Sequence, residues 1–255
     1  MKILAIGNSF AEDTFWLTPQ IALSMGLSDI TFAHLYFGGC SINRHILHAN
    51  EDQPAYGYRK SSGGEWSDMP CVRMRTALED EAWDWIILST GTGDGSRWTE
   101  AQFYVRLPEL IAYVKQYVPT RTKFAFNVTW TGEPSFSQPD LDKFCGDQIA
   151  MLDAINAIIR AHVATLPEIA AIIPTGVAVQ NLRESHGENI SRDGYHLSYD
   201  LGRYTAGVTA MMVLTGCGDV EKVTYTVVDE TVTAKVFAAV TDALRTPYTV
   251  TVKPR

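Results

Sequence analysis

The sequence predicts an α/β protein in which a three-layer, doubly wound parallel sheet carries helices on both faces. Two observations lead to this fold class. Short apolar runs that suit buried strands alternate with longer stretches whose apolar residues have helical spacing. The short runs are apolar throughout instead of alternating with polar residues, which is typical of parallel strands covered by helices on both sides.

The expected strands are short runs bounded by Gly, Pro, Asp or Asn, at residues 3–6, 30–37, 85–89, 123–128 and 169–174. The expected helices occupy residues 14–25, 70–81, 99–117, 140–166 and 199–214. Proline is tolerated in a first helical turn, which suits Pro70, and Thr99 with Glu100 are cap candidates. The Gly/Ser-rich segment 56–67 is expected to form a hairpin or an excursion near a site.

A single domain is expected over residues 1–255, because no internal repeat or low-complexity linker interrupts the alternation. Its last part, residues 219–255, reads as an appended C-terminal element. Two β-branched segments, 222–228 and 248–253, flank an expected helix at 230–244. We therefore expect this element to lie at a sheet edge, where the two segments could pair as strands.

The composition is that of a globular protein, because 255 residues with 46% hydrophobic ones can bury a large core. The formal net charge of −8 predicts no nucleic-acid partner and no membrane association, since both need clustered Lys and Arg. The opening apolar run is too short for a signal peptide or a membrane span. A cytoplasmic location is expected for the chain as given, and a secreted or periplasmic one if a signal peptide was trimmed. The oligomeric state is not predicted.

The cysteines and glycine-rich loops indicate neither a metal nor another cofactor. Cys40, Cys71, Cys145 and Cys217 are widely spaced, without a Cys-x-x-Cys pair or a Cys/His cluster of zinc spacing. They are expected to be free, buried thiols, although an even count could also form disulfides. The glycine-rich segment 90–95 lacks the Gly-Lys-Ser/Thr of a phosphate loop, so a nucleotide site is not supported.

Ligands of an open parallel sheet bind beyond the carboxyl ends of its strands, and two early loops there are unusual. The segment Gly7-Asn8-Ser9-Phe10 follows the first strand and puts a serine at the start of a helix. Ser9 could be a nucleophile if a base takes its proton, or only a helix cap. After the second strand, Gly38-Gly39 could present N–H groups to an oxyanion or form a simple tight turn.

A later polar loop, residues 191–198, contains an aspartate and a histidine three residues apart across a glycine turn. The Asp193 carboxylate could accept the Nδ1–H of His196 and fix its tautomer, which would leave Nε2 as a base for Ser9. Such a D-x-x-H pattern is common by itself. Its position after a serine turn and a Gly-Gly turn favours a catalytic triad.

In order and strand placement, these segments resemble the sequence blocks of the SGNH (GDSL-type) hydrolase superfamily over roughly residues 1–216. Residues 7–10 resemble the nucleophile block, Gly38 or Gly39 the glycine block, 91–94 the G-x-N-D block and 193–196 the D-x-x-H block. More narrowly, the chain is similar to a bacterial branch of uncharacterised SGNH-like domains at residues 83–88, 175–183 and 193–204.

The resemblance implies a flavodoxin-like SGNH fold and a serine esterase. Ser9 would be the nucleophile, His196 the general base and then general acid, and Asp193 the residue that orients it. The backbone N–H groups of Ser9 and Gly39 would bind the oxyanion. The residues expected to contact substrate are Asn8, Phe10, Gly38, Gly93, Asp94, Trp130 and Tyr195.

One departure from the family pattern bears on activity. The superfamily's third oxyanion donor is an asparagine, and Gly93 stands at that position. Losing one such donor costs about 10²–10³ in rate, so either activity is weak or another group substitutes. The candidates for this substitution are Asn8, Asn43, Asn127, Gln180 and Arg183.

The expected substrate is a small acyl ester, with an O-acetyl group on a carbohydrate preferred by analogy alone. The main alternative is a catalytically weak or inactive carbohydrate- or ligand-binding domain on the same scaffold, which Gly93 favours. The presence of serine, aspartate and histidine together argues against it, because a binding module needs none of them. A nucleotide-binding domain of flavodoxin type is a weaker rival, because no phosphate loop is found.

Overall fold

The computed structural model of the chain describes residues 1–90, 102–135 and 139–251. In these residues the parallel strands are β1 (Lys2–Gly7), β2 (Thr31–Tyr36), β5 (Trp85–Ser89), β6 (Lys123–Asn127) and β7 (Ile169–Ile173). An antiparallel hairpin, β3 (Tyr56–Ser62) and β4 (Trp66–Val72), adds to β2. The order of the seven-stranded sheet is β4-β3-β2-β1-β5-β6-β7. The predicted α/β class and the five predicted strands are confirmed.

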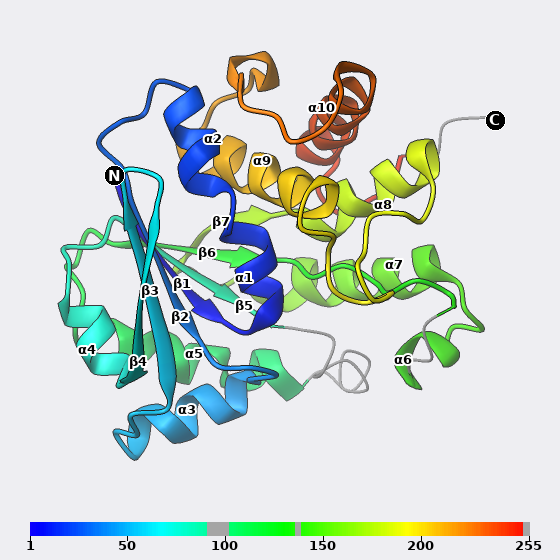
Figure 1. Cartoon of the computed structure of the whole chain (residues 1–255). Helices are drawn as coiled ribbons and strands as arrows, with labels where there is room; N and C mark the ends of the chain where they lie inside the picture. Colours follow the sequence, from blue (N-terminus) through cyan, green and yellow to red (C-terminus); the bar gives the residue numbers. More distant parts are fainter. Residues whose placement is uncertain (91–101, 136–138, 252–255) are drawn as a thin grey trace.

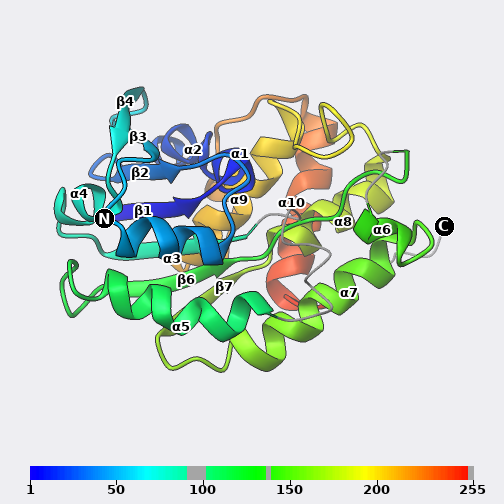
Figure 2. The same ribbon diagram turned by 90° about the horizontal axis from the view of Figure 1, so that it is seen from below.

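Helices cover both faces of this sheet, as Figures 1 and 2 show from two directions. One face carries α1 (Ser9–Phe15), α2 (Thr18–Ser24), α8 (Thr175–His186), α9 (Leu201–Thr215) and α10 (Glu230–Arg245). The other carries α3 (Ile42–Asn50), α4 (Met74–Glu79), α5 (Gln102–Val114) and α7 (Gln148–Ile158), which continues as a π-helical turn (Ile159–Val163). A short helix, α6 (Pro139–Asp142), precedes α7.

The apolar strands divide their side chains between two cores because successive residues of a strand point to opposite faces. In β1, Ile3 and Ala5 belong to the core that includes α1, α8 and α9, whereas Leu4 and Ile6 belong to the other core. All four are at most 1% exposed. This explains why the strands show no apolar and polar alternation in the sequence.

The helix predicted at 14–25 is two helices, and the first already begins at Ser9. Pro19 lies in the first turn of α2 and has no N–H to donate to the preceding turn. The carbonyl of Phe15 instead accepts a hydrogen bond from the Thr18 hydroxyl at 2.6 Å. The chain therefore bends between the two helices.

The helix predicted at 70–81 is wrong in its first part, because Pro70 lies in β4 and the helix begins at Met74. β4 is the edge strand of the sheet, the position at which a proline costs no ladder hydrogen bond. The segment 56–67 forms most of the β3–β4 hairpin, so the hairpin expectation is correct.

Three further helices differ from the prediction. The helix at 140–166 is interrupted where Cys145 and Gly146 take positive φ angles of 55° and 79°, after which Asp147 caps α7. Helices α3 and α8 were not predicted. α5 is described from Gln102, so the cap candidates Thr99 and Glu100 lie outside the described residues. α9 agrees with its prediction to within two residues.

The C-terminal element contains the expected helix, α10, but residues 222–228 form no strand. α10 lies against α8 and α9, where Val236, Val240 and Ala243 are fully buried. The expected edge position is therefore wrong, because the apolar side chains of this element pack on helices that already cover the sheet. Residues 248–251 form no strand either, and 252–253 lie outside the described residues.

The four cysteines form no disulfide, and only Cys40 is buried. Cys71, at a bulge of β4, and Cys145, in the turn before α7, are exposed and take positive φ angles, so the expectation of buried thiols is wrong for both. No helix in the described part of the chain is both long enough and apolar enough to cross a membrane.

Candidate active site

Ser9 stands at the carboxyl end of β1, as the first residue of α1. The strand turns into the helix within two residues, and Gly7 permits this close approach. A Cβ at Gly7 would lie 2.6 Å from the Cβ of Ala11 and 2.6 Å from the Oγ of Ser89. Ser9 is partly exposed, whereas residues 3–7 of β1 are buried. The turn thus presents one hydroxyl at the edge of the sheet.

Asn8 shapes this turn. Its Oδ1 accepts the N–H of Phe10 at 3.0 Å and caps α1, while its Nδ2 donates to the carbonyl oxygen of Cys40 at 3.1 Å. The side chain is 4% exposed. A contact between Asn8 and substrate does not fit this burial, because both ends of its amide already connect the β1–α1 turn to the β2–α3 loop.

The Gly38-Gly39 turn lies beside the serine turn. The N–H of Phe37 donates to the carbonyl oxygen of Gly7 at 3.1 Å, and the N–H of Cys40 closes the turn on Phe37 at 3.1 Å. Both glycines are exposed. Among the described residues, no backbone hydrogen bond from the N–H of Ser9 or of Gly39 is present.

Asp193 and His196 lie in a small closed loop between α8 and α9. The N–H of Arg192 donates to the carbonyl oxygen of His196 at 3.0 Å, and Gly194 takes a φ of 80° that favours glycine. The Asp193 Oδ1 accepts the N–H of Tyr195 at 2.9 Å and that of His196 at 2.7 Å. The local sequence alone therefore sets the direction of the carboxylate.

The structure brings Ser9, Asp193 and His196 into one chain of hydrogen bonds. Asp193 Oδ2 lies 2.7 Å from His196 Nδ1, and His196 Nε2 lies 2.9 Å from Ser9 Oγ. Both distances are within the range for a nucleophile, its base and the group that orients the base. The arrangement can remove the proton of the hydroxyl as it attacks.

The surroundings of Asp193 favour the ionised form of its carboxyl group. Partial burial opposes ionisation, but the hydrogen bonds from the His196 ring and from the N–H groups of His196 and Tyr195 outweigh it. The pKa of the Asp193 carboxyl is consequently lower than its ordinary value. Asp193 is therefore an anion at neutral pH, as a residue that fixes the histidine tautomer must be.

A second carboxylate, that of Asp13, fixes this loop in place, and Asp13 was not among the site residues predicted from the sequence. Asp13 lies in α1, one turn beyond Ser9, and is 0% exposed. Its two oxygens accept from Nη1 of Arg192 at 2.9 and 3.1 Å, from Nε of Arg203 at 2.8 Å and from the N–H of Leu197 at 3.0 Å. The helix that carries the serine thus anchors the loop that carries the base.

The partners of Asp13 lie 179 to 190 residues away in the sequence, which leaves no local pattern for such a cluster. The sequence shows only two adjacent acidic residues, Glu12 and Asp13, in this helix. Arg203 appeared in the family resemblance without a role, and Arg192 directly precedes the aspartate of the triad.

An aromatic cluster supports the loop from the core side. The Phe10 ring lies 4.5 Å from the Trp130 ring and 4.8 Å from the Tyr195 ring, centroid to centroid. Trp130 also donates its indole N–H to the Tyr195 carbonyl oxygen at 2.9 Å. Phe10 and Trp130 are 2% and 0% exposed, so the expected substrate contacts do not fit them. Tyr195 is partly exposed above them.

The donors proposed to replace the missing asparagine are mostly engaged elsewhere. Asn127 bonds Thr14 and Thr175, at 3.1 and 2.6 Å. Arg183 is buried and donates to the Thr131 carbonyl oxygen at 2.6 Å. Gln180 is buried as well, and the role of Asn8 is given above.

Of the five candidates, Asn43 alone has an exposed side chain without a hydrogen bond to the described residues. It lies in the first turn of α3, just after the Gly38-Gly39 turn. Gly93 and Asp94 lie outside the described residues.

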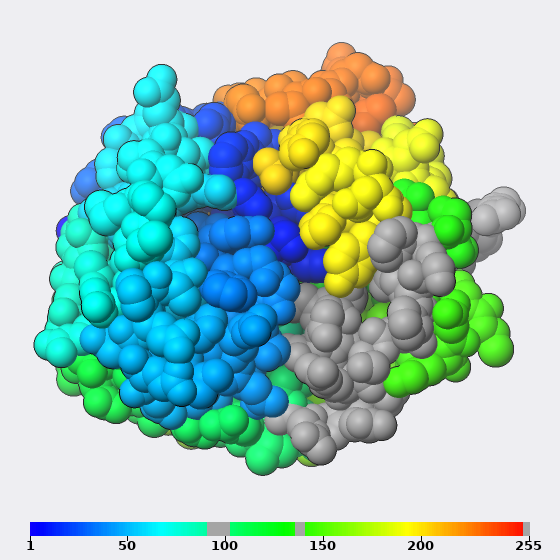
Figure 3. All heavy atoms as spheres, turned by 60° about the horizontal axis from the view of Figure 1, so that its bottom comes forward, coloured from blue at the N-terminus to red at the C-terminus, as the bar shows by residue number. Residues whose placement is uncertain are grey.

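The site opens into a surface groove. In Figure 3 the dark-blue start of the chain forms the floor of a hollow between two walls. One wall is the blue and cyan region of α3 and the β3–β4 hairpin, and the other is the yellow loop after α8. No group of three or more His, Cys, Asp or Glu residues suited to a metal ion occurs in the described part of the chain.

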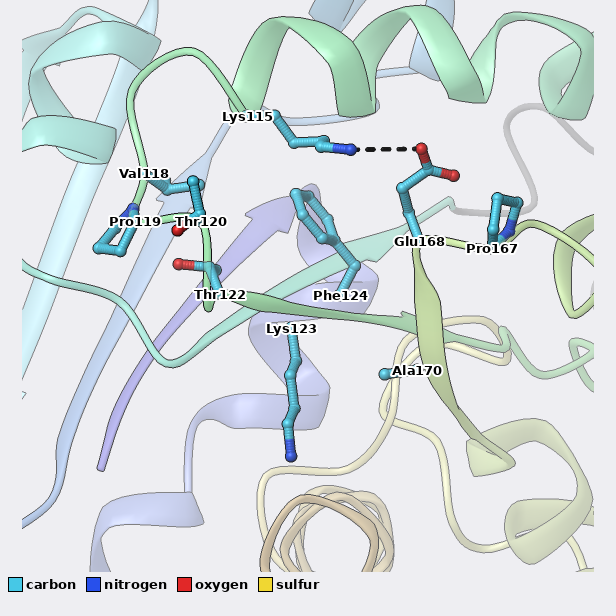
Figure 4. A pocket seen from close by; sticks show the side chains of 10 residues that line it. All are labelled: Lys115, Val118, Pro119, Thr120, Thr122, Lys123, Phe124, Pro167, Glu168 and Ala170. Carbon is cyan, nitrogen blue, oxygen red and sulfur yellow. Dashed lines mark hydrogen bonds and ion pairs between the residues drawn. The ribbon is translucent and has the colours of Figure 1, made fainter.

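A cavity of about 540 Å³ lies at the opposite end of the strands, at the amino ends of β6 and β7. Figure 4 shows Lys115 and Glu168 meeting above it, with 3.4 Å between Nζ and Oε1. Ligands of open parallel sheets bind at the carboxyl ends instead, and no triad residue reaches this cavity. We therefore place the candidate active site in the groove.

The fold has counterparts among solved structures. A DUF4886 family protein from Bacteroides uniformis is 30% identical, with a TM-score of 0.90 over 99% of this chain and 97% of that one. An acetyl xylan esterase is 13% identical, with a TM-score of 0.52 over 83% and 98% of the two chains. A GDSL-like lipase from Bacteroides thetaiotaomicron is 12% identical, with a TM-score of 0.47 over 87% and 88%.

None of the curated proteins matches this chain. The predicted SGNH resemblance is supported at the level of the α/β fold, which this chain shares with the acetyl xylan esterase. A family model covers residues 2–245 and is described as Domain of unknown function (DUF4886). The chain belongs to this family, whose match extends over Ser9, Asp193, His196 and all of α10.

Proposed function

We propose that this chain is a serine esterase that hydrolyses small acyl esters. The observation that carries the proposal is the distance of 2.9 Å between Ser9 Oγ and His196 Nε2, two atoms from residues 187 positions apart. Asp193 completes the set with its contact of 2.7 Å to His196 Nδ1. A binding module has no need of a serine, a base and an orienting carboxylate in this order.

The mechanism follows from the positions of these groups. Ser9 Oγ attacks the ester carbonyl carbon while His196 Nε2 takes the hydroxyl proton, and Asp193 stabilises the imidazolium that forms. The N–H groups of Ser9 and Gly39 hold the negative oxygen. As the tetrahedral intermediate collapses, His196 gives the proton to the departing alcohol oxygen. Water then attacks the acyl-serine with the same histidine as base, which releases the acid and restores Ser9.

The substrate class we favour is an O-acetyl ester of a carbohydrate. A solved structure of the same fold is named an acetyl xylan esterase, which supports this choice without carrying it, because only 13% of the residues are identical. The oxyanion site has no described asparagine donor, which favours one alternative: a weakly active or inactive carbohydrate-binding domain on the same scaffold.

The experiment that tests the proposal is p-nitrophenyl acetate hydrolysis by the wild type, Ser9→Ala and His196→Ala, combined with fluorophosphonate labelling. We expect turnover and labelling at Ser9 in the wild type, and a fall to background in both variants. Matched controls are Ser185→Ala, in the outer turn of α8, and His162→Ala, an exposed histidine on the other face; both should keep wild-type rates. Equal rates in all five proteins would favour the alternative of a binding domain.

A further inference from the structure

Three arginines and three aromatic residues alternate beside the site, on segments that run from β2 and β3 across the end of α1 to α9 and the loop before it. We call this set the aromatic–arginine ladder; its members in order are Tyr36, Arg59, Trp16, Arg203, Tyr199 and Arg192. The Arg59 guanidinium lies 5.4 Å from the Tyr36 ring centre and 5.5 Å from that of Trp16. Arg203 lies 5.0 Å from Trp16 and 4.8 Å from Tyr199. Arg192 lies 4.8 Å from Tyr199.

The ladder adjoins the reactive serine. Glu12 and Asp13, which hold its arginines, lie three and four residues after Ser9 in α1. The hydroxyl of Tyr36 lies beside the Gly38 turn, 3.3 Å from where a Cβ would stand at Gly38. Tyr199 follows His196 by three residues and is 66% exposed. The ladder therefore connects the two walls of the groove that Figure 3 shows.

The charges of the ladder are balanced. Arg59 is paired with Glu12 and, at 3.5 Å, with Asp68. Arg192 and Arg203 share the Asp13 carboxylate. Three cations thus face three anions, so the groove offers donors and acceptors without an excess of either charge. Such a surface suits a neutral ligand rich in hydroxyl groups, and it suits neither an alkyl chain nor an anion.

We propose that the aromatic–arginine ladder is the subsite for the alcohol part of the substrate, and that this alcohol is a neutral saccharide. The inference rests on the proposed esterase function and adds the residues that recognise the alcohol. The exposed Tyr199 ring receives a sugar face, and the Arg192 and Arg203 guanidinium groups, each 4.8 Å from the ring centre, hold that ring in place. Sugar hydroxyls bond Arg59 and Glu12 on the opposite wall. The acyl carbonyl then reaches Ser9 at the groove floor.

The first test compares acetate release from acetylated xylotriose with hydrolysis of p-nitrophenyl acetate. We expect Tyr199→Ala and Arg59→Ala each to lower the ratio of the two kcat/KM values by about three- to tenfold, mainly through KM for the saccharide. Tyr199→Trp should preserve the ratio, because it keeps an aromatic face. Arg75→Ala, a control at an exposed arginine of α4 that pairs with Glu79 and lies over the Tyr117 ring, should leave it unchanged. A ratio that is unaffected in both ladder variants overturns the proposal, as does a preference for p-nitrophenyl octanoate over the saccharide ester.

The second test separates this inference from the esterase function. Xylotriose without acetyl groups is titrated into Ser9→Ala, with and without Tyr199→Ala, and binding is followed by NMR chemical shifts. We expect binding that weakens by about three- to tenfold when Tyr199 is removed. If binding occurs but p-nitrophenyl acetate is not hydrolysed by the wild type, the esterase proposal fails and the saccharide subsite stands. If Ser9 is catalytic but no saccharide binds, the subsite is wrong and the esterase proposal stands.

Discussion

Asp193 and Asp13 contact the same loop, yet they do so in opposite surroundings. The Asp193 side chain is 46% exposed, and its partners are two backbone N–H groups and a ring no more than three residues away. The Asp13 side chain is 0% exposed, and its partners lie 179 to 190 residues away. The first carboxylate orients the His196 ring, and the second anchors the loop that carries that ring.

From this difference in surroundings we infer that Asp193 serves the reaction and that Asp13 serves the stability of the fold. A half-exposed carboxylate with local partners contributes little to folding, because water would solvate it nearly as well. A buried carboxylate between two guanidinium groups cannot lose its charge without leaving them uncompensated. We therefore expect substitutions of Asp193 to affect the rate and substitutions of Asp13 to affect both the fold and the rate.

The largest effect is expected from Asp193→Asn on turnover. The amide oxygen can still accept the backbone N–H groups, but the amide nitrogen then faces Nδ1 of His196 and favours the tautomer that cannot accept the Ser9 proton. The same change in a serine protease lowers kcat by about 10⁴, which corresponds to about 5.4 kcal/mol. The measurement is kcat for p-nitrophenyl acetate.

For the same variant, Asp193→Asn, we expect little change in the free energy of unfolding. Urea unfolding should show a change within about 1 kcal/mol, because the side chain is nearly half exposed. A large loss of stability with little change in kcat would reverse the roles that we assign to the two carboxylates.

Asp13→Asn is expected to lower the free energy of unfolding by about 3–5 kcal/mol, the usual cost of removing one partner from a buried ion pair. The neutral amide would leave Arg192 and Arg203 with an uncompensated charge. Because the loop loses its anchor to α1, kcat should fall as well. The measurements are urea unfolding and kcat at a temperature at which the variant is folded.

Asp68→Asn is the matched control, since this aspartate also pairs with a groove arginine but its side chain is 62% exposed. Its stability should change by less than about 1 kcal/mol. If the two variants lose equal stability, burial does not distinguish the Asp13 cluster from a surface ion pair.

A pH dependence of stability sets the range in which these comparisons are made. Burial lowers the pKa of His34 to about 3, with Arg59 adding to it, and burial with His48 does the same for His45. Their unfolded pKa is about 6.5, so below this pH the unfolded chain binds protons that the folded chain does not. The free energy of unfolding therefore has its full value above pH 6.5, and below this pH it falls by about 1.4 kcal/mol per histidine per pH unit.

This slope is measured by urea unfolding at pH 7, 6 and 5. His34→Leu should reduce this slope by the contribution of about one proton, which is about 1.4 kcal/mol per pH unit. His162→Ala, at an exposed histidine, should leave the slope unchanged. Asp193 adds nothing over this range: its folded pKa is below the ordinary value, so the stability it contributes is lost only as the pH falls through that lower pKa. A flat profile between pH 7 and 5 would contradict the buried, neutral state of the two histidines.

Particular elements show how far the sequence predicted the fold. The five parallel strands were predictable because each is apolar on both faces and ends at a turn residue. The segment around Pro70 was not, because a proline suits both a first helical turn and an edge strand. The C-terminal segment 222–228 has strand composition but no strand, since it meets a helical layer with no free sheet edge.

The sequence by itself determined the local parts of the site: a serine after the first strand, a Gly-Gly turn after the second, and an aspartate three residues before a histidine. These depend on backbone geometry over a few residues, which residue types specify directly. The tertiary structure alone decided that His196 reaches Ser9, that Asp13 anchors the loop, and that Phe10 and Trp130 are buried supports instead of substrate contacts. Contacts between residues more than a hundred positions apart leave no periodic pattern in one sequence, because each side chain is chosen by neighbours that only folding brings near.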